Sequence, residues 1–590
     1  MSNRKPDIQA ETSLRRRPLE WWERRKLESN GCRSLDWSSV RLCDATDLDS
    51  VQNVEFAGAV SLGILRRELG SEIADARIEN CVIGDYACIR GIGIHIKNCV
   101  VGRNARITDV SLIEFEPEAQ CGVGAEVDVL DETGSRAVTI YPGLSAQAAL
   151  LMAREPRWNE RYLRPILEDH VERLTPRHVI GDGAVIENCG ELRNVCVGNE
   201  VRVSGARRLS NGMIINNAAP GRCLAFVGNG VDAENFIIED GRADSGAIIR
   251  NCYIGQGASL EKGFSAHDSL FFANCSLENG EACALFAGPY TVSMHKSSLL
   301  IGCQTSFMNA GSGTNQSNHM YKLGPVHWGI LERGVKTSST SYLMLGAKIG
   351  AFSLLMGQHK THPDSSQFPF SYLFGDEKGA TVVVPGVMLR SCGLMRDEQK
   401  WPTRDRRLKR RLPMHDRIVF NVLNPLTVDK MLSASEVIET LLGRPADDDR
   451  YLRYRGMKFT RASLERARHL YELAIYKYLS TRMENGGIQA GGDSARPDEW
   501  VDIAGLPMTR TYLHRAMEAE SMVAMEKIFS EAMDNYPELE RKWISARFPA
   551  RWHRPAEVIA DYAREFDRMI EEDRTRYLED LAAQNEMLSL

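Results

Sequence analysis

The chain repeats one five-residue word, first as NCVIG at residues 80–84 and then, 18 residues later, as NCVVG at residues 98–102. The word returns as NCYIG at residues 251–255. Around these copies an aliphatic residue recurs at every sixth position, with a small residue four places after it. Three hexapeptides make one interval of 18 residues, so the pattern predicts a coil of three short strands, which is the signature of a parallel β-helix.

Cysteine usage agrees with this repeat. Eleven of the 14 cysteines lie between Cys81 and Cys303, where the coil explains them as small apolar core residues. The chain has no CxxC pair and no secretion signal, which argues against a disulfide framework. Aliphatic side chains are expected to point into the coil, and glycines to occupy corners that need a positive φ or a close approach.

Composition and charge limit the classes of function. Hydrophobic residues make up 43% of the 590 residues and charged residues 26%, as in ordinary globular proteins. The net charge of −6 provides no global field for nucleic acid or anionic lipid, and we expect the basic run RDRRLKRR at 404–411 to be a solvated helix face. Because no apolar run is long enough for a membrane span, we expect a cytoplasmic protein without a membrane span. The balanced charge makes nucleic acid an unexpected partner.

The changes of period along the chain predict three regions. Residues 1–50 read as a short helical lead that caps the solenoid. Residues 51–400 carry the β-helix, interrupted at about 144–174 by a helical insertion that contains Pro156 and Pro165. Residues 401–590 show helical periodicity and are predicted to form a helical cap or a trimer-stabilising domain. The expected fold class is therefore mainly β, with a C-terminal helical domain.

Several stretches carry a family resemblance beyond the hexapeptide period: residues 31–37, 53–58, 318–342, 357–372 and 390–400. With them the chain resembles an uncharacterised bacterial family of large hexapeptide-repeat proteins, within the left-handed β-helix superfamily of trimeric acyltransferases. The resemblance implies a left-handed coil, a homotrimer, substrate sites in grooves between neighbouring rods, and acyl-CoA as the donor. No Gly-rich phosphate loop followed by a lysine is present, so the chain lacks the signature of a nucleotidyltransferase.

Histidines cluster where the repeat becomes polar. Five of the 13 lie between 295 and 362, and the segment HKTHPD at 359–364 is the richest part. A neutral imidazole can take a proton from a hydroxyl or amine, and a nearby carboxylate can fix its tautomer. By analogy with hexapeptide acyltransferases, the predicted catalytic residues are His359, His362, Asp364 and His319.

The same coils supply polar, cationic and aromatic side chains that suit an anionic sugar, a sugar phosphate or a nucleotide sugar. The predicted substrate-binding residues are Asn318, Lys322, His327, Trp328, Gln358, Tyr372, Arg390, Arg396 and Lys400. We therefore predict a transferase-like protein in which a histidine assists acyl transfer, or transfer of a related group, in an intersubunit groove.

Two alternatives remain open from the sequence. In the first, His359 and His362 join His319 or His327 of a neighbouring chain around a metal, as in the γ-class carbonic anhydrases, although the spacing here differs from that family's. In the second, the groove binds a metabolite without catalysis and the helical region binds a partner. If the protein is a transferase, we expect no structural metal.

Overall fold

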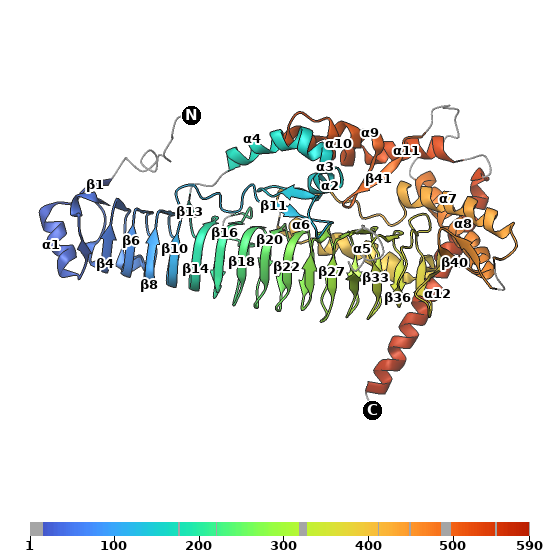
Figure 1. Ribbon diagram of the computed structural model, residues 1–590, viewed down its shortest axis with the longest axis horizontal. Coiled ribbons are helices and arrows are strands. Elements are labelled where there is room, and N and C mark those ends of the chain that lie inside the picture. The colour runs from blue at the N-terminus through green and yellow to red at the C-terminus, as the bar shows by residue number, and fades with distance from the viewer. Residues whose placement is uncertain are drawn as a thin grey trace.

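The structure is a computed structural model that describes residues 16–174, 178–219, 221–317, 327–410, 412–447, 450–484, 497–548 and 552–588. A long stack of strands runs through most of the chain, and helices of the insertion and of the C-terminal region cover one side of the stack and one end (Figure 1). The expectation of a mainly β chain with C-terminal helices is confirmed. No helix among the described residues is long and apolar enough to cross a membrane.

The strands of the stack join in one 38-stranded sheet in which most neighbours are parallel. Ile73 pairs in register with Ile89, Ile89 with Ile107, and Ile107 with Ile186, so inward residues of successive coils lie above one another. The longest strands in this ladder are β4 (Val51–Ala57), β6 (Ile73–Glu79), β8 (Cys88–Lys97), β10 (Arg106–Glu114), β14 (Val185–Val197), β16 (Arg208–Ile215), β18 (Asp232–Glu239), β20 (Ile248–Ile254) and β22 (Ser265–Phe271). Shorter strands that bear on the sites are β15 (Arg202–Ser204), β17 (Phe226–Val227), β19 (Arg242–Ala243), β21 (Ser259–Glu261), β23 (Ser276–Glu278), β33 (Tyr342–Met344), β35 (Leu354–Met356) and β36 (Gln358–His359).

The asparagine of the repeated word sits at a corner of the coil. Asn80 and Asn98 have φ values of 50° and 56°, in the left-handed region that asparagine tolerates better than most residues. The Asn80 side-chain amide donates to Asn98 Oδ1 at 3.2 Å, so corners of neighbouring coils are joined by side chains. Glycine was expected at corners, and the structure adds asparagine, because its short amide satisfies the turn and bonds the next coil.

Cysteines behave as the repeat predicts. Eleven of the 14 are buried and none is in a disulfide. The Sγ atoms of Cys81 and Cys99, one coil apart, lie 3.8 Å from each other. Cys283 and Cys392 are half-buried, and Cys223 is exposed.

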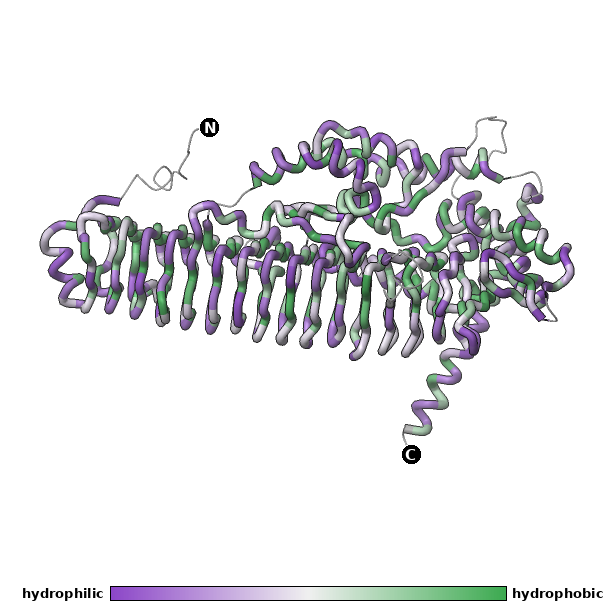
Figure 2. Tube along the Cα trace, viewed as in Figure 1, coloured by the Kyte–Doolittle hydropathy of each residue, from purple (hydrophilic) through white to green (hydrophobic). Residues whose placement is uncertain are grey.

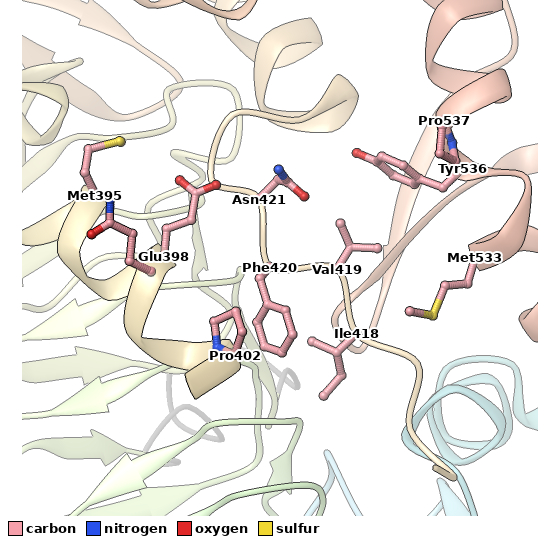
Figure 3. Close-up of a pocket in the computed structure, with 11 residues that line it drawn as sticks. Met395, Glu398, Pro402, Ile418, Val419, Phe420, Asn421, Met533, Tyr536 and Pro537 are labelled. Atoms are coloured by element: carbon pink, nitrogen blue, oxygen red, sulfur yellow. The ribbon is translucent and has the colours of Figure 1, made fainter. Parts of the chain in front are cut away.

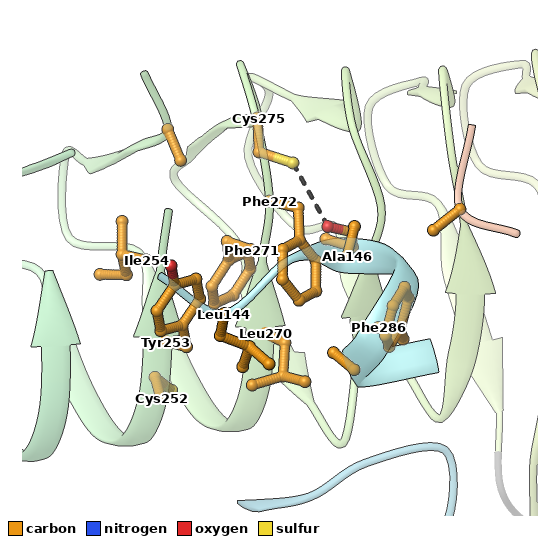
Figure 4. Packing of buried hydrophobic residues seen from close by; sticks show 14 of the residues in the cluster. Leu144, Ala146, Cys252, Tyr253, Ile254, Leu270, Phe271, Phe272, Cys275 and Phe286 are labelled. Carbon is orange, nitrogen blue, oxygen red and sulfur yellow. Dashed lines mark hydrogen bonds between the residues drawn. The ribbon is translucent and has the colours of Figure 1, made fainter. Parts of the chain in front are cut away.

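The insertion between β10 and the next strand of the stack, β13 (Val179–Ile180), forms a small sheet and a run of helices. Its elements are β11 (Glu126–Asp128), β12 (Ala137–Thr139), α2 (Ala146–Arg154), α3 (Pro156–Trp158), the π-helical turn η4 (Asn159–Leu163) and α4 (Arg164–Leu174). Leu144 and Ala146 lie against the aromatic side chains of Tyr253, Phe271 and Phe272 of the stack (Figure 4). The insertion therefore extends the hydrophobic core of the stack sideways.

The C-terminal region begins where the stack ends. The antiparallel strands β37 (Tyr372–Gly375) and β38 (Thr381–Val384) close the last coil, and β38 pairs with β40 (Met457–Phe459), which forms a hairpin with β39 (Leu452–Tyr454). The hairpin β41 (Trp500–Ile503) and β42 (Leu506–Thr509) lies over the insertion. The helices are α5 (Cys392–Arg404), α6 (Arg406–Arg410), α7 (Pro425–Leu442), α8 (Arg461–Glu484), α9 (Arg510–Met517), α10 (Met522–Asp534), α11 (Tyr536–Arg547) and α12 (Ala556–Leu588). At the other end, α1 (Trp21–Ser29) precedes the first coils, with β1 (Arg16–Pro18) antiparallel to β3 (Val40–Cys43).

Buried polar groups fix the insertion to this region. The Gln147 amide, fully buried, donates to the carbonyl oxygens of Arg417, Ile503 and Ala504 at 3.1–3.2 Å. Polar and apolar residues alternate along the strands of the stack, whereas the helix α2 is apolar along most of its length (Figure 2). Asp416 accepts hydrogen bonds from the backbone N–H groups of Ala146 in the insertion and Ala273 in the stack, at 2.7 and 2.8 Å, and Arg417 pairs with Glu526 of α10. The segment 412–424, which we call the strap, therefore lies between the stack, the insertion and α10.

Candidate functional site

The structure places the two predicted catalytic histidines in different surroundings. His359 is fully buried, in register with the core residue Leu343. Its Nδ1 lies 2.9 Å from Thr381 Oγ1 and its Nε2 lies 3.2 Å from the Met356 carbonyl oxygen. Burial lowers the pKa of His359 to about 4. Both ring nitrogens are therefore occupied by the protein itself, whereas His362 is exposed.

The neighbouring predicted residues form local contacts. Asp364 Oδ1 accepts hydrogen bonds from the backbone N–H and the hydroxyl of Ser366, at 3.1 and 2.6 Å. Gln358 is exposed beside Tyr342 of the preceding coil, and Tyr372 meets Phe374 edge-on, with ring centroids 6.1 Å apart.

The remaining predicted residues are spread over several coils and α5. Trp328 lies under the Arg136 guanidinium, 5.1 Å from the ring centroid, and His327 is half-buried. Arg390 and Arg396 are exposed, Arg396 lies 3.8 Å from Asp397, and Lys400 is half-buried. Three predicted residues lie outside the described residues: Asn318, His319 and Lys322. Among described residues no three His, Cys, Asp or Glu side chains gather as metal ligands, and the assignment of these coils as a site stays a prediction.

Three arginines meet instead at a groove on the side of the stack. The arginine groove has a volume of about 710 Å³. It is lined by three arginines, Arg202, Arg242 and Arg406, by two carboxylates, Asp240 and Glu261, and by Cys223, Leu224, Phe226 and small residues of the coils.

Strand register builds one wall of the arginine groove. Arg202 pairs with Phe226, Phe226 with Arg242, and Arg242 with Ser259, so four outward side chains from successive coils form one row. The inward neighbours are apolar, as in Val203 beside Arg202. Because side chains alternate between the two faces of a strand, the sequence fixes these arginines on the outside.

Ion pairs and a cation–π contact hold these arginines in place. Arg242 lies over the Phe226 ring, 4.5 Å from its centroid, and pairs with Asp244 and Glu261 at 2.5 and 2.7 Å. Arg202 pairs with Glu187. The side chains of Arg202 and Arg242 remain 55% and 45% exposed, so their guanidinium groups can also meet a ligand.

Arg406 enters the groove from α6. Its Nη2 donates to Ser276 Oγ at 3.1 Å and its backbone N–H donates to Asn274 Oδ1 at 3.0 Å. The next residue, Arg407, is buried and bonds Asp405 through Nε and Nη2 at 3.1 and 2.8 Å. The basic run at 404–411 therefore anchors α6 on the stack, at least through the residues described there.

A buried carboxylate lies beside the arginine groove. Glu239 is 2% exposed and its oxygens accept from the Gly143 backbone N–H, Tyr253 Oη and Asn217 Nδ2 at 2.7–2.9 Å, while His415 Nε2 lies 2.9 Å away. Burial alone would raise the pKa of Glu239, but the hydrogen bond and charge of His415, with the hydrogen bonds from Gly143 and Tyr253, together hold the pKa below its ordinary value. Burial opposes protonation of His415, yet the hydrogen bond and charge of Glu239 raise its pKa.

His415 is therefore an imidazole oriented by a carboxylate. One ring nitrogen faces Glu239, the side chain is 21% exposed, and Nδ1 has no hydrogen-bond partner among the described residues. Gln256 links this pair to the groove, because its Nε2 donates to Asp240 Oδ2 at 3.1 Å and its Oε1 accepts from the His415 backbone N–H at 3.2 Å. Burial raises the pKa of Asp240, which lines the groove.

Sequence reasoning missed the arginine groove and the His415–Glu239 pair, although two signals were present. Arg202 and Arg242 each precede an apolar residue at the start of a strand, and an acidic pair at 239–240 interrupts an otherwise apolar strand end. Neither signal shows which coils become neighbours, because segments of different lengths outside the repeat separate one coil from the next.

Fold and groove define the class: a mainly β protein built on a long stack of parallel strands, with an arginine-lined groove on its side and helices over one face. The chain belongs to the family described as a domain of unknown function (DUF4954), whose model matches residues 16–442. All residues of the groove lie in that range. The prediction of an uncharacterised family is confirmed.

A curated relative of this chain is likewise uncharacterised. An "Uncharacterized protein" of Treponema pallidum (strain Nichols) is 23% identical over 457 residues, which cover 72% of this chain and 62% of the relative. The chain thus spans less than two thirds of the length of that relative.

Proposed function

We propose that this protein binds a small phosphate-bearing metabolite, of the sugar phosphate or nucleotide sugar class, in the arginine groove. The convergence of Arg202, Arg242 and Arg406 on one cavity carries the proposal. Guanidinium groups bind phosphate oxygens through paired hydrogen bonds, and a net charge of −6 leaves such recognition to a local cluster. Phe226 offers an aromatic face beside the cations for a sugar or a base.

We further propose that the protein is a group-transfer enzyme of the left-handed β-helix, hexapeptide-repeat class, assembled as a homotrimer, with acyl-CoA as the donor. The hexapeptide period and the coil register support this class. In the proposed step, the acceptor hydroxyl oxygen attacks the thioester carbonyl carbon and His415 Nδ1 takes the hydroxyl proton. The carbon–sulfur bond then breaks, and the CoA thiolate leaves and takes up that proton.

His415 is a better general base for this step than His359. A general base needs a ring nitrogen that is not already bonded within the protein. The Nδ1 of His415 has no hydrogen-bond partner among the described residues, whereas both nitrogens of His359 are bonded inside the core and burial lowers its pKa to about 4. Glu239 fixes the tautomer of His415 and stabilises its protonated form.

Isothermal titration calorimetry tests the ligand class. The probes are uridine diphosphate glucose, glucose 1-phosphate and inorganic phosphate. Losing one charge-assisted bond costs about 1.5–3 kcal/mol, so Arg242→Gln is expected to weaken the tightest of these complexes roughly tenfold to hundredfold. Arg77→Gln is the matched control, since Arg77 is also an outward strand residue, 48% exposed and paired with Glu55 and Glu79. Equal losses in both variants, or no binding of any probe, would contradict the assignment.

Transfer is tested separately by mass spectrometry of acetyl-CoA consumption in the presence of the tightest-binding acceptor. His415→Gln is expected to abolish turnover and to leave acceptor binding within about threefold, because the groove arginines are untouched. His362→Gln is the control for the sequence-based assignment. Loss of turnover in the His362 variant alone would instead assign the general base to the coils around residue 362. Binding without turnover in the wild-type chain would favour the non-catalytic scaffold.

A further inference from the structure

A second cavity shares no lining residue with the arginine groove. It is formed by α5, the strap, and the junction of α10 and α11, and has a volume of about 630 Å³, within the range of small-molecule sites. We call it the α5–α11 pocket (Figure 3). Its apolar wall consists of Met395, Pro402, Ile418, Phe420 and Met533.

Polar groups gather on the other side of the α5–α11 pocket. The hydroxyl of Tyr536 points toward Asn421, and the Glu398 carboxyl lies on the same side (Figure 3). Tyr536 is 7% exposed and its hydroxyl has no hydrogen-bond partner within the described ranges. Burial raises the pKa of Tyr536 well above its ordinary value, and burial also raises the pKa of Glu398. Tyr536 is therefore a hydrogen-bond donor at neutral pH.

Unpartnered groups continue behind the strap. Arg333 is 2% exposed and stacks on Phe307, 5.0 Å from its ring centroid. Its Nη2 donates to the carbonyl oxygen of Val419, which lines the α5–α11 pocket. Nε and Nη1 of Arg333 have no hydrogen-bond partner in the described structure, although Nη1 lies 3.5 Å from Asp502.

These groups are concentrated at one place. Among the described residues, 13 buried side-chain nitrogen and oxygen atoms lack a hydrogen-bond partner, and six of them belong to Arg333, Trp500, Asp502, Thr509 and Tyr536. The Trp500 and Tyr536 rings are 5.2 Å apart, and Trp500 pairs with Thr509 across the hairpin. Folded proteins leave few such atoms unpaired, so a cluster calls for a missing partner.

The chemistry of the cluster selects that partner. Five of the six atoms carry a hydrogen that they can donate: Nε and Nη1 of Arg333, Nε1 of Trp500 and the hydroxyls of Thr509 and Tyr536. The Asp502 oxygen is the one atom of the six that can only accept. The missing partner must therefore supply acceptor oxygens. Of the five residues only Tyr536 lines the pocket, and the cationic Arg333 lies directly behind Val419, so an anionic head on a hydrocarbon body fits the donor, the nearby charge and the apolar wall.

We propose that the α5–α11 pocket binds a free carboxylic acid with an unbranched hydrocarbon chain. The hydrocarbon lies against Met395, Ile418 and Phe420. A carboxylate oxygen accepts a hydrogen bond from the Tyr536 hydroxyl, and the Arg333 guanidinium, which bonds the Val419 carbonyl from behind and does not line the pocket, supplies positive charge nearby. This site is independent of the arginine groove and of the acetyl-transfer proposal.

Titration calorimetry of the full chain with hexanoate, octanoate, decanoate and dodecanoate tests the site. Octan-1-ol and octylamine are the neutral and cationic probes with the same chain as octanoate. At least one carboxylate is expected to bind, and octanoate to bind at least tenfold more tightly than octan-1-ol. Failure of all four carboxylates, or equal affinity for octan-1-ol and octanoate, overturns the proposal.

Tyr536→Phe removes only the hydroxyl, and Tyr577→Phe on the projecting part of α12 is its control. Tyr536→Phe is expected to weaken octanoate binding at least tenfold while leaving the melting temperature of the ligand-free protein unchanged or raised, since it deletes an unpaired buried group. Unchanged octanoate affinity in this variant overturns the assignment of the head group.

A bulky side chain that fills the pocket tests the binding site without changing Tyr536. Met533→Trp is expected to abolish octanoate binding, and Val523→Trp, at an exposed position on the same helix, to leave it unchanged. Retention of octanoate binding in the Met533 variant shows that the acid lies elsewhere and overturns the proposal.

Discussion

Replacement of Gly212 by alanine tests the stacking of coils at a point where two strands are closest. Gly212 in β16 pairs in register with Phe236 in β18. A Cβ atom built on Gly212 would lie 2.2 Å from Phe236 Cε1 and 2.3 Å from Cζ, well inside van der Waals contact. Its φ is not in the left-handed region, so the penalty comes from contact and not from backbone strain.

The size of the effect follows from this contact. The Phe236 ring is fully buried and has no open space to move into, so we expect the overpacking penalty of about 1–3 kcal/mol. Phe236→Leu alone creates a small cavity that costs about 1–2 kcal/mol. In the double variant the new methyl group occupies part of the vacated space, so the combined loss should fall short of the sum by about 1 kcal/mol or more.

The double-mutant cycle consists of the wild type, Gly212→Ala, Phe236→Leu and the double variant. Differential scanning calorimetry measures the unfolding midpoint and enthalpy of each of these four proteins. Gly443→Ala is the matched control, because Gly443 has a φ of −76° and the nearest atom to its added Cβ is 3.6 Å away. Equal midpoints for the two glycine variants, or strictly additive losses in the cycle, would refute the contact between these two coils.

Three further outcomes follow from the buried polar groups. The His415–Glu239 pair stabilises the fold fully between about pH 4.3 and 6.5, the ordinary pKa values of the two groups. This stabilisation is lost as pH rises through the raised pKa of His415 and as it falls through the lowered pKa of Glu239, so the melting-temperature gap to His415→Gln should peak near pH 5.5; a gap independent of pH would exclude the ion pair. Tyr253→Phe removes one donor to buried Glu239 and should cost about 1.5–3 kcal/mol in urea unfolding, and an unchanged midpoint would contradict the hydrogen bond. Asp405→Asn leaves the buried Arg407 without its carboxylate and should cost about 3–5 kcal/mol, with increased proteolysis near α6 as the local readout; a stable, protected variant would speak against the anchor.

The parallel strand stack could be predicted because its signal is local. The word at residues 80–84 and its copy at 98–102 place an aliphatic residue inside every turn, and cysteine burial follows from the same alternation. Asparagine at the corners was not predicted, since glycine and asparagine satisfy a left-handed turn for different reasons. Only the structure shows that Asn80 also bonds Asn98.

The candidate site was harder to predict because side-chain direction and coil register are not local. The histidine count identifies a cluster in the sequence. It does not show that the His359 side chain points into the core, in register with Leu343. The arginine groove depends on Arg202 and Arg242 lying in one row, and on Arg406 returning from α6. That return depends on the buried Arg407–Asp405 pair, whose charges make the same segment look solvated in the sequence.

Alkylation of Cys223 with N-ethylmaleimide tests ligand binding in the arginine groove most directly. Cys223 is the exposed cysteine, it lines the groove, and the half-buried Cys392 on α5 serves as an internal reference. Peptide mass spectrometry follows both rates with and without saturating uridine diphosphate glucose or glucose 1-phosphate. If the groove holds the phosphate-bearing metabolite, the ligand will slow alkylation of Cys223 at least tenfold and leave Cys392 unchanged. An unprotected Cys223 at a ligand concentration that saturates the calorimetric titration would place the ligand elsewhere and contradict the proposed function.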